Sequence, residues 1–179
     1  MKRFLLFFVI VLMMAGFSSK VMAQITDSKT NHANAQILGA ITLTAGQNLE
    51  FGGIVPDATG GTVIIDNIDG RTKTGSITLV NSKVIPKSGS YTLTGTGSVP
   101  YSITVPTESF DITNTTGTGS QTMTVTELTC SKGTLTAGSV TTAFPSAGID
   151  AFKVGGTLTV GPSQVPGVYT GTFSVTVAY

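Results

Sequence analysis

The sequence predicts an all-β protein built as an antiparallel β-sandwich, and three observations support this fold class. Threonine and glycine are abundant, with 31 Thr and 22 Gly among 179 residues, and this composition is typical of short strands joined by turns. Apolar and polar residues alternate in many short segments, which is the period of a strand with one buried face. No segment of helical length carries apolar residues at the three- and four-residue spacing of an amphipathic helix.

The alternating segments follow one another with turn residues between them. Residues 24–34 are polar and are predicted to form a flexible leader, and residues 35–179 are predicted to form a single sandwich domain. Pro100 and Pro106 bracket one alternating segment, as expected at strand ends. The predicted strands cover residues 35–43, 49–53, 63–65, 77–79, 91–93, 101–105, 110–112, 123–128, 154–160 and 169–179.

Two of these strands have a distinctive pattern. The alternation that begins at Thr122 breaks at Leu128, and a β-bulge near Glu127 would restore it. The last strand alternates most regularly, and its two faces can be assigned directly. The residues predicted to face the core are Tyr169, Gly171, Phe173, Val175, Val177 and Tyr179, and those predicted to face solvent are Thr170, Thr172, Ser174, Thr176 and Ala178.

Charged residues are scarce, at 11% of the chain compared with about 25% in a typical soluble protein. A formal net charge of +1 is unlike that of a protein that binds nucleic acid through a basic surface, so we expect no nucleic-acid partner. The single cysteine, Cys130, excludes a disulfide scaffold. Its neighbours Thr129 and Ser131 favour a core residue over a reactive thiol. Low charge also leaves the strand edges with little protection against pairing with another chain.

The first 23 residues have the order of a secretory signal peptide. A basic start precedes an apolar run over residues 4–17, and Val21-Met22-Ala23 supplies the small residues of a cleavage site. The apolar run is shorter than the roughly 20 residues that cross a bilayer, although an uncleaved anchor is the alternative. We expect a mature chain that begins at Gln24, has no membrane span, and is exported to the periplasm, the cell surface or the extracellular space.

The sequence contains no recognisable catalytic, cofactor-binding or metal site, so we expect no enzymatic activity. His32 is the only histidine and lies in the polar leader, without the partners that a triad or a zinc site requires. Asp66, Asn67, Asp69 and Gly70 provide oxygen ligands on alternate positions, but their spacing is not that of a calcium loop. The same residue types favour a turn between strands, which we predict here. The other carboxylates offer no basis for choosing a pair for glycosidic cleavage.

One short motif predicts that a loop is exposed to solvent. Asn114-Thr115-Thr116 matches the acceptor triplet for N-glycosylation. The triplet lies in a predicted loop over residues 113–120, and we expect this loop to be exposed.

Several segments, taken in order, resemble a known family. They are residues 49–56 (LEFGGIVP), 60–63 (GGTV), 101–106 (YSITVP), 154–158 (VGGTL) and 167–179 (GVYTGTFSVTVAY). Together they resemble the bacterial secreted family labelled domain of unknown function 4402, over about residues 35–179. The resemblance implies an immunoglobulin-like sandwich, related to pilin-like and spore-coat-like secreted subunits, with no catalytic activity attached to it.

The last strand also resembles the C-terminal strand of chaperone–usher pilus subunits, which has an upstream glycine and a tyrosine near its end. The resemblance implies β-augmentation, in which a periplasmic chaperone with its usher, or a neighbouring subunit, pairs with a sheet edge. The polar leader 24–34 lacks the alternating apolar residues of a donor strand. Either residues 35–43 donate the strand, or the protein does not assemble in this way. The candidate strand-pairing residues are Gly167, Tyr169, Phe173, Val175, Val177 and Tyr179.

Three functions are consistent with these observations. The first is a non-enzymatic, exported structural protein, a cell-surface or fimbria-like subunit assembled through strand pairing. The second is a secreted adhesin or glycan-binding module that uses the loops 113–120 and 132–148, including the aromatic Phe144. The third is an envelope hydrolase. We favour the first, because the last strand and the scarcity of charge both point to strand pairing. The sequence identifies no small-molecule ligand.

Overall fold

The alternating segments form strands throughout the domain. The computed structural model describes residues 26–117 and 121–179, and within these residues there is no helix. The strands are β1 (Thr42–Gln47), β2 (Gly53–Val55), β3 (Gly61–Ile65), β4 (Arg71–Gly75), β5 (Thr78–Val80), β6 (Gly89–Thr94), β7 (Pro100–Thr104), β8 (Phe110–Asn114), β9 (Thr122–Cys130), β10 (Ser139–Ala143), β11 (Ile149–Val160), β12 (Tyr169–Thr170) and β13 (Thr176–Ala178).

The chain divides into two units, Met1–Gln36 and Ile37–Tyr179. In the first unit, the described residues 26–36 form no strand, and His32 is exposed. The predicted signal peptide, its cleavage site and the expected mature start at Gln24 lie outside the described residues. Across the part of the chain that the structure covers, no helix is long and apolar enough to cross a membrane.

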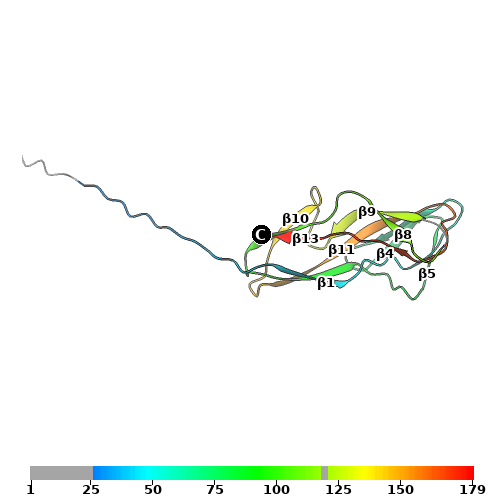
Figure 1. Cartoon of the computed structure of the whole chain (residues 1–179), viewed down its shortest axis with the longest axis horizontal. Helices are drawn as coiled ribbons and strands as arrows, with labels where there is room; N and C mark the ends of the chain where they lie inside the picture. The colour runs from blue at the N-terminus through cyan, green and yellow to red at the C-terminus, as the bar shows by residue number, and fades with distance from the viewer. Residues whose placement is uncertain (1–25, 118–120) are drawn as a thin grey trace, which may run out of the picture. The chain divides into compact units, whose positions relative to one another are not determined.

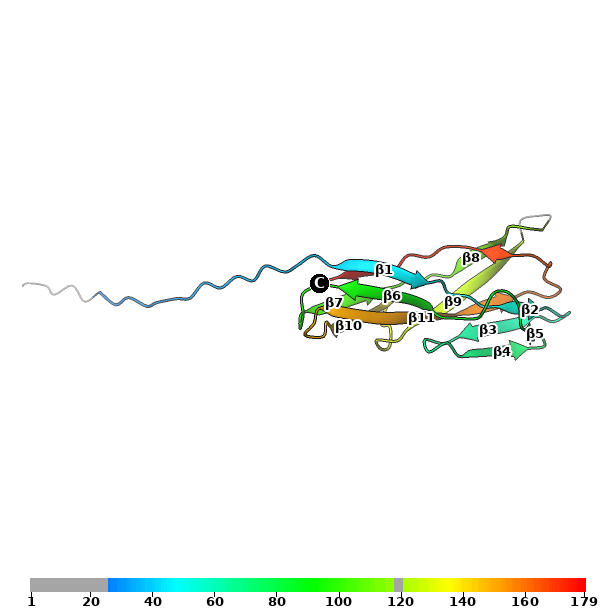
Figure 2. The ribbon, with the colours of Figure 1, turned by 90° about the horizontal axis from the view of Figure 1, so that it is seen from below.

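The second unit is an antiparallel β-sandwich, as the sequence predicts (Figures 1 and 2). Its largest sheet has the order β1-β6-β11-β9-β8-β12, and β3 also pairs with β11 and carries β4 at its outer edge. A three-stranded sheet, β10-β7-β13, and a two-stranded sheet, β2-β5, complete the fold. All pairings between these strands are antiparallel.

Strand β11 joins the two halves of the largest sheet. Along one edge it pairs with β6 up to Val154 and with β3 from Gly156 onwards, while its other edge pairs with β9. The change of partner occurs at Gly155, where a Cβ atom would lie 2.3 Å from the carbonyl oxygen of Ile65 and 2.7 Å from Oγ1 of Thr129. The backbones therefore approach too closely for any side chain at this position.

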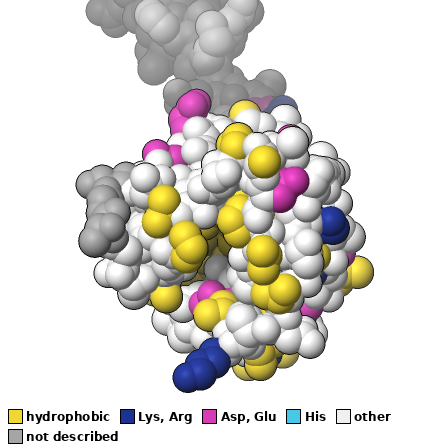
Figure 3. All heavy atoms as spheres, turned by 90° about the vertical axis from the view of Figure 1, so that its right-hand side faces the viewer, with side chains coloured by type: hydrophobic (Ala, Val, Ile, Leu, Met, Phe, Trp, Pro, Cys, Tyr) yellow, Lys and Arg dark blue, Asp and Glu magenta, His cyan; other side chains and the backbone are white. Residues whose placement is uncertain are grey.

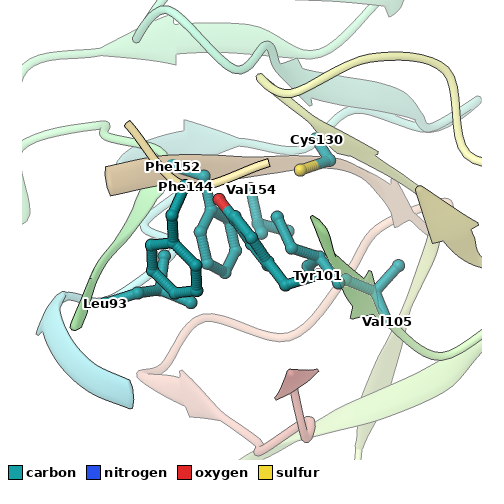
Figure 4. Packing of buried hydrophobic residues seen from close by; sticks show 8 residues of the cluster. Leu93, Tyr101, Val105, Cys130, Phe144, Phe152 and Val154 are labelled. Atoms are coloured by element: carbon teal, nitrogen blue, oxygen red, sulfur yellow. The ribbon is translucent and has the colours of Figure 1, made fainter. Parts of the chain in front are cut away.

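Two hydrophobic cores lie along β11. The first contains Tyr101 and Phe144, whose ring centroids are 4.4 Å apart (Figure 4). It also contains Phe152, whose ring stacks on Tyr91. The second lies beneath the β2-β5 sheet. Buried residues of the first core are Leu93, Tyr101, Ile103, Val105, Cys130, Phe144, Phe152 and Val154, and those of the second are Val63, Ile77, Val125, Leu158 and Val160.

The bulge expected near Glu127 is confirmed. The register between β11 and β9 shifts between Gly155 and Thr157, so that one residue of β11, Gly156, faces two of β9, Glu127 and Leu128. Glu127 has a positive φ of 51°, and its carboxylate accepts a hydrogen bond from Thr157 Oγ1 at 3.1 Å. The bulge returns Leu128 to the apolar side, where it packs against both cores.

The first predicted strand is wrong in its position. Residues 35–43 were expected to form it, but β1 spans Thr42–Gln47. Its partner β6 ends where Thr94 faces Thr42, so earlier residues have no neighbouring strand to bond with. Ala35 is exposed, and Ile37 is 96% exposed rather than facing the core.

Other strand predictions need smaller corrections. The short strand expected at residues 49–53 lies at Gly53–Val55, and β11 begins five residues earlier than predicted, at Ile149. Strands β4 and β10 were not predicted. Their sequences are RTKTG and SVTTA, and neither contains the alternating large apolar residues that indicate a half-buried strand.

Candidate functional site

The C-terminal segment forms two short ladders rather than the uninterrupted strand predicted over residues 169–179. Tyr169 and Thr170 pair with β8, and Thr176–Ala178 pair with β7. The chain advances six residues from Thr170 to Thr176, whereas the facing chain advances nine residues from Thr104 to Thr113. Because the facing chain has the longer path, the two backbones fall out of register and residues 171–175 belong to neither ladder.

The predicted alternation survives this interruption. Tyr169, Phe173, Val175 and Val177 are half-buried, while the threonines and the serine between them are exposed. Phe173 stacks on Phe110 with ring centroids 5.3 Å apart. Gly171 is exposed, but its backbone lies against β8, since a Cβ atom there would be 2.7 Å from the carbonyl oxygen of Asp111.

Tyr179 links the end of the chain to its beginning. Its hydroxyl donates a hydrogen bond to the carbonyl oxygen of Gly39 at 2.8 Å and accepts one from the backbone N–H of Thr96 at 2.7 Å. The Gly39 N–H in turn donates to Thr96 Oγ1 at 2.7 Å. The Tyr179 ring lies 6.3 Å from Phe144, and 45% of the residue is exposed. Gly39 and Thr96 were not singled out from the sequence, because this contact joins residues 140 positions apart.

Gly167 lies over Asn114, at the start of the predicted loop. Residues 115–117 are exposed, as predicted for this loop, whereas Asn114 itself is buried. Asn114 is only 8% exposed. Its side-chain oxygen accepts hydrogen bonds from the backbone N–H groups of Thr116 and Gly117, and its side-chain nitrogen donates to the carbonyl oxygen of Pro166. The amide is therefore occupied in holding the loop, because a buried polar group needs such partners. Residues 118–120 of the same predicted loop lie outside the described residues.

Replacing Gly167 with alanine should lower the free energy of unfolding. A Cβ atom there would lie 2.3 Å from both polar atoms of the Asn114 amide, so the side chain must shift and lose hydrogen bonds. We expect a loss of about 1–2 kcal/mol in urea unfolding, in the range of overpacking changes. The matched control is Gly89→Ala, because a Cβ atom at Gly89 would make only ordinary contacts of 3.5 Å or more. Equal stability of the two variants would contradict this account of Asn114.

The open strand edges beside the first core include those of β1 and β13. Within the described residues, β1 pairs only with β6, and β13 pairs only with β7. Ile41 and Leu43 from one side and Phe173, Val175 and Val177 from the other pack against the first core, and all five are only half-buried. We call the surface between these two edges the seam.

Neither edge of the seam carries a charge. Residues 30–49 and 154–179 contain no Asp, Glu, Lys or Arg. Sheet proteins commonly protect exposed edges with lysine or other charged side chains. Strand β4, at the other end of the largest sheet, has this protection in Arg71 and Lys73. The seam therefore combines unpaired backbone, partly exposed core side chains and no electrostatic barrier to another strand.

The acidic residues considered as ligands have other partners. Oδ1 of Asp66 accepts the backbone N–H groups of Ile68 and Gly70, which confirms the predicted turn between β3 and β4. Asp69 pairs with Ser88 and Lys153, and the hydrogen bond from Lys153, followed by those from Ser88, holds the pKa of its carboxyl well below the ordinary value. Among the described residues, no group of three or more His, Cys, Asp or Glu could hold a metal ion.

Phe144 and Cys130 are both core residues. Phe144 is 3% exposed, which corrects the expectation that this aromatic side chain is available for ligand recognition on a loop. Cys130 is also 3% exposed, as the sequence predicts. Burial raises the pKa of the Cys130 thiol, so the thiol remains protonated at neutral pH.

A polar cluster ties the two main sheets together near the first core. Tyr101 on β7 donates a hydrogen bond from its hydroxyl to Oδ2 of Asp150 on β11 at 2.8 Å, and Lys132 pairs with Oδ1 of the same carboxylate. The Asp150 side chain is only 9% exposed. Burial raises the pKa of Asp150, but the hydrogen bonds from Lys132, Tyr101 and the Ala151 N–H outweigh burial and hold the pKa below its ordinary value of 3.8.

A second apolar surface lies at the end of the domain that carries β2 and β5. In Figure 3, apolar side chains surround a hollow on this face. Exposed residues from this region are Val55, Val80, Val84 and Ile85. Arg71 donates to the carbonyl oxygen of Gly53 at 2.7 Å. Its buried Nε has no hydrogen-bond partner in the described part of the chain.

Comparison with known families gives one match. The model of the family described as a domain of unknown function, DUF4402, matches residues 41–179. The chain belongs to the DUF4402 family. The region matched by the DUF4402 model begins at Ile41, one residue before β1, and includes the whole sandwich and both edges of the seam. No curated protein and no solved structure matches the chain.

Proposed function

We propose that this DUF4402 protein is an exported, non-enzymatic structural subunit of the cell surface that assembles by β-strand pairing at the seam. The observation that carries the proposal is the pair of open, uncharged edges, β1 and the C-terminal segment, on either side of half-buried core side chains. A strand placed there would bond to unpaired backbone groups and complete the burial of these side chains.

Burial supplies the driving force for this pairing. Removing the remaining exposed surface of Phe173, Val175 and Val177 from water contributes about 25 cal/mol for each Å² of apolar area. Pairing also satisfies backbone groups of residues 171–175, which lie outside both ladders. A charged partner surface is not required, because the seam carries no charge. The partner is therefore a strand, supplied by a neighbouring subunit or by a periplasmic chaperone during export.

Export is supported by the first 23 residues, which have the basic start, apolar run and small-residue site of a signal peptide. The mass of the protein recovered from the envelope of its native cells tests this part of the proposal. We expect the mass of a chain that begins at Gln24. A chain that retains residues 1–23 in the cytoplasm would contradict export.

Lysine at the two edges should block assembly. We expect the chain from Gln24 to form concentration-dependent oligomers in sedimentation velocity, and Thr44→Lys combined with Thr172→Lys to remain monomeric. Both threonines are exposed, so the substitutions should not disturb the core, and an edge lysine must be desolvated if another strand pairs beside it.

The matched control is Thr72→Lys, on the edge strand β4, which is also exposed and already carries Arg71 and Lys73. It should assemble like the unmodified chain. Assembly of the double seam variant at the unmodified level would contradict the proposed function, as would an unmodified chain that remains monomeric at every concentration.

A further inference from the structure

We propose that a hollow on the outer face of the largest sheet binds a protonated primary amine carried on a short aliphatic chain. The hollow has a volume of about 250 Å³ and lies over β3, β9 and β11. None of the residues that line it belongs to the seam, and the inference does not depend on the proposed function. The lining residues include Ile64, Asp66, Asn67, Glu127, Thr129 and Thr157.

The bulge in β9 places a carboxylate in this hollow. Val125 is buried in the second core, so regular alternation would direct residue 127 towards that core as well. The bulge adds one residue without a partner, and Glu127 lines the hollow while Leu128 returns to the cores. Bulges often redirect a side chain at a functional site. Here the redirected side chain lies beside the point at which β11 changes partner from β6 to β3.

One oxygen of the Glu127 carboxylate is fixed and the other is available. Thr157, which is only 8% exposed, donates a hydrogen bond from Oγ1 to Oε2 of Glu127 at 3.1 Å. Among the described residues, Oε1 accepts no hydrogen bond, and no Lys or Arg lines the hollow. Lys132 after β9 and Lys153 on β11 are each paired with an aspartate elsewhere. The carboxylate is therefore held in position with one acceptor open to a ligand.

The charge of the hollow favours a cation. Asp66 directly follows β3 and lies across β11 from Glu127, because β3 and β9 pair with opposite edges of β11. Oδ1 of Asp66 is held by its own turn, whereas Oδ2 accepts no hydrogen bond from the described part of the chain. Two carboxylates around one hollow attract a positive group and repel an anion. The Thr129 hydroxyl and the Asn67 side-chain oxygen offer further acceptors to an ammonium group, which has three donors.

The size and the apolar wall of the hollow favour an organic cation over a metal ion. A cavity needs only about 10–15 Å³ to hold a water molecule, and a bare metal ion is no larger, so such an ion would leave most of the hollow unfilled. Half-buried Ile64 provides an apolar wall. A lysine side chain buries its methylene groups against such a wall while its ammonium group stays at the polar side. The ligand class is therefore an alkyl ammonium, supplied by a lysine of another protein or by a free amine.

Titration of the ¹⁵N-labelled chain from Gln24 with n-butylammonium, followed by NMR, tests the inference. We expect the backbone amide signals of Asn67, Gly156 and Thr157 to shift, with a dissociation constant in the millimolar range. n-Butanol and butyrate have a similar stem without the positive charge, and both should bind at least about tenfold more weakly. Glu127→Gln keeps the size of the side chain and an oxygen for Thr157 but removes the charge. It should unfold at the same urea concentration as the unmodified chain and bind the amine about tenfold more weakly.

The matched control is Glu108→Gln, because Glu108 is exposed and does not line the hollow. This variant should bind n-butylammonium like the unmodified chain. Two further probes distinguish the sources of the amine. Tighter binding of Nα-acetyl-lysine amide would identify a protein lysine, and tighter binding of putrescine would identify a free polyamine.

Three results would overturn the inference. The first is the absence of shifts at these amide signals, or equal binding of n-butylammonium and n-butanol. The second is unchanged amine binding by Glu127→Gln, since the carboxylate would then have no part in recognition. The third is displacement of the amine by Ca²⁺ at a tenfold lower concentration, because the hollow would then be a metal site. If Glu127→Gln does not fold, the comparison of n-butylammonium with n-butanol decides.

Discussion

Replacing Gly155 with alanine is expected to destabilise the domain by about 3 kcal/mol, at the upper end of the cost of overpacking. The added Cβ atom would lie 2.3 Å from the carbonyl oxygen of Ile65 and 2.8 Å from the carbonyl carbon of Asp66. Both are backbone atoms, so no side-chain rotation can relieve the contact. Strand β3 would have to move away from β11 at the position where β11 changes partner from β6 to β3.

Gly156→Ala provides the control, because Gly156 is the next residue of β11 after Gly155. A Cβ atom at Gly156 would meet the end of the Leu128 side chain at 2.9 Å, and that side chain can rotate. We expect a loss of about 1 kcal/mol or less. Urea unfolding of both variants, followed by circular dichroism, measures the difference. Equal losses would show that the close approach of β3 does not set the requirement for glycine.

Most of the sandwich could be predicted from alternation, because strands that bury one face show it directly in the sequence. The bulge at Glu127 is the clearest case, since a break in the period at Leu128 requires one additional residue. Strands β4 and β10 could not be found in this way. Strand β4 is an edge strand with no large apolar residue, and its pairing depends on β3 and on the turn at Asp66.

Alternation predicted the face of most residues in the C-terminal segment, although Gly171 and Tyr179 are exposed rather than core-facing; it did not predict their neighbours. Alternation correctly places Phe173, Val175 and Val177 towards the core. The interruption between the two ladders arises from the longer path of the facing chain, which no pattern within residues 169–179 reveals. The exposure of Ile37 has a similar cause, because alternation shows that a segment can form a strand and not whether a neighbour is present.

The seam likewise depends on contacts between residues that are far apart in the sequence. The Tyr179 hydroxyl reaches Gly39, three residues before β1 begins at Thr42, and both the first and the last strand of the domain pack on the same core. Asn114 depends on such contacts as well. The motif correctly predicted an exposed loop, seen at residues 115–117, but the burial of the Asn114 side chain depends on Pro166 and Gly167, more than 50 residues later.

Asp150 is the residue whose charge should matter most for stability. It accepts hydrogen bonds from Tyr101 on the facing sheet and from Lys132 after β9, so one carboxylate joins three parts of the chain. Asp150→Asn would leave the Lys132 ammonium without its counter-ion. Breaking a fully buried pair costs about 3–5 kcal/mol. Because the Lys132 side chain is 24% exposed, we expect a smaller loss of about 2–3 kcal/mol at pH 7.

The loss caused by Asp150→Asn should depend on pH in a defined direction. The pKa of Asp150 in the folded protein lies below its ordinary value of 3.8. The carboxylate therefore stabilises the fold fully above about pH 5, and this contribution disappears as the pH falls through the lower folded pKa. We expect urea unfolding between pH 7 and pH 2.5 to show a difference in the free energy of unfolding between the two proteins. This difference should be constant above about pH 5 and should narrow below about pH 4.

A matched control and a double variant isolate this pair. Asp111→Asn changes an exposed carboxylate that accepts a hydrogen bond from Thr124, and it should cost less than about 0.5 kcal/mol. Lys132→Met combined with Asp150→Asn should be less destabilised than the sum of the single variants, because each single change removes the same ion pair. Additive losses, or a difference from the unmodified protein that does not change with pH, would show that Asp150 acts through packing rather than through its charge.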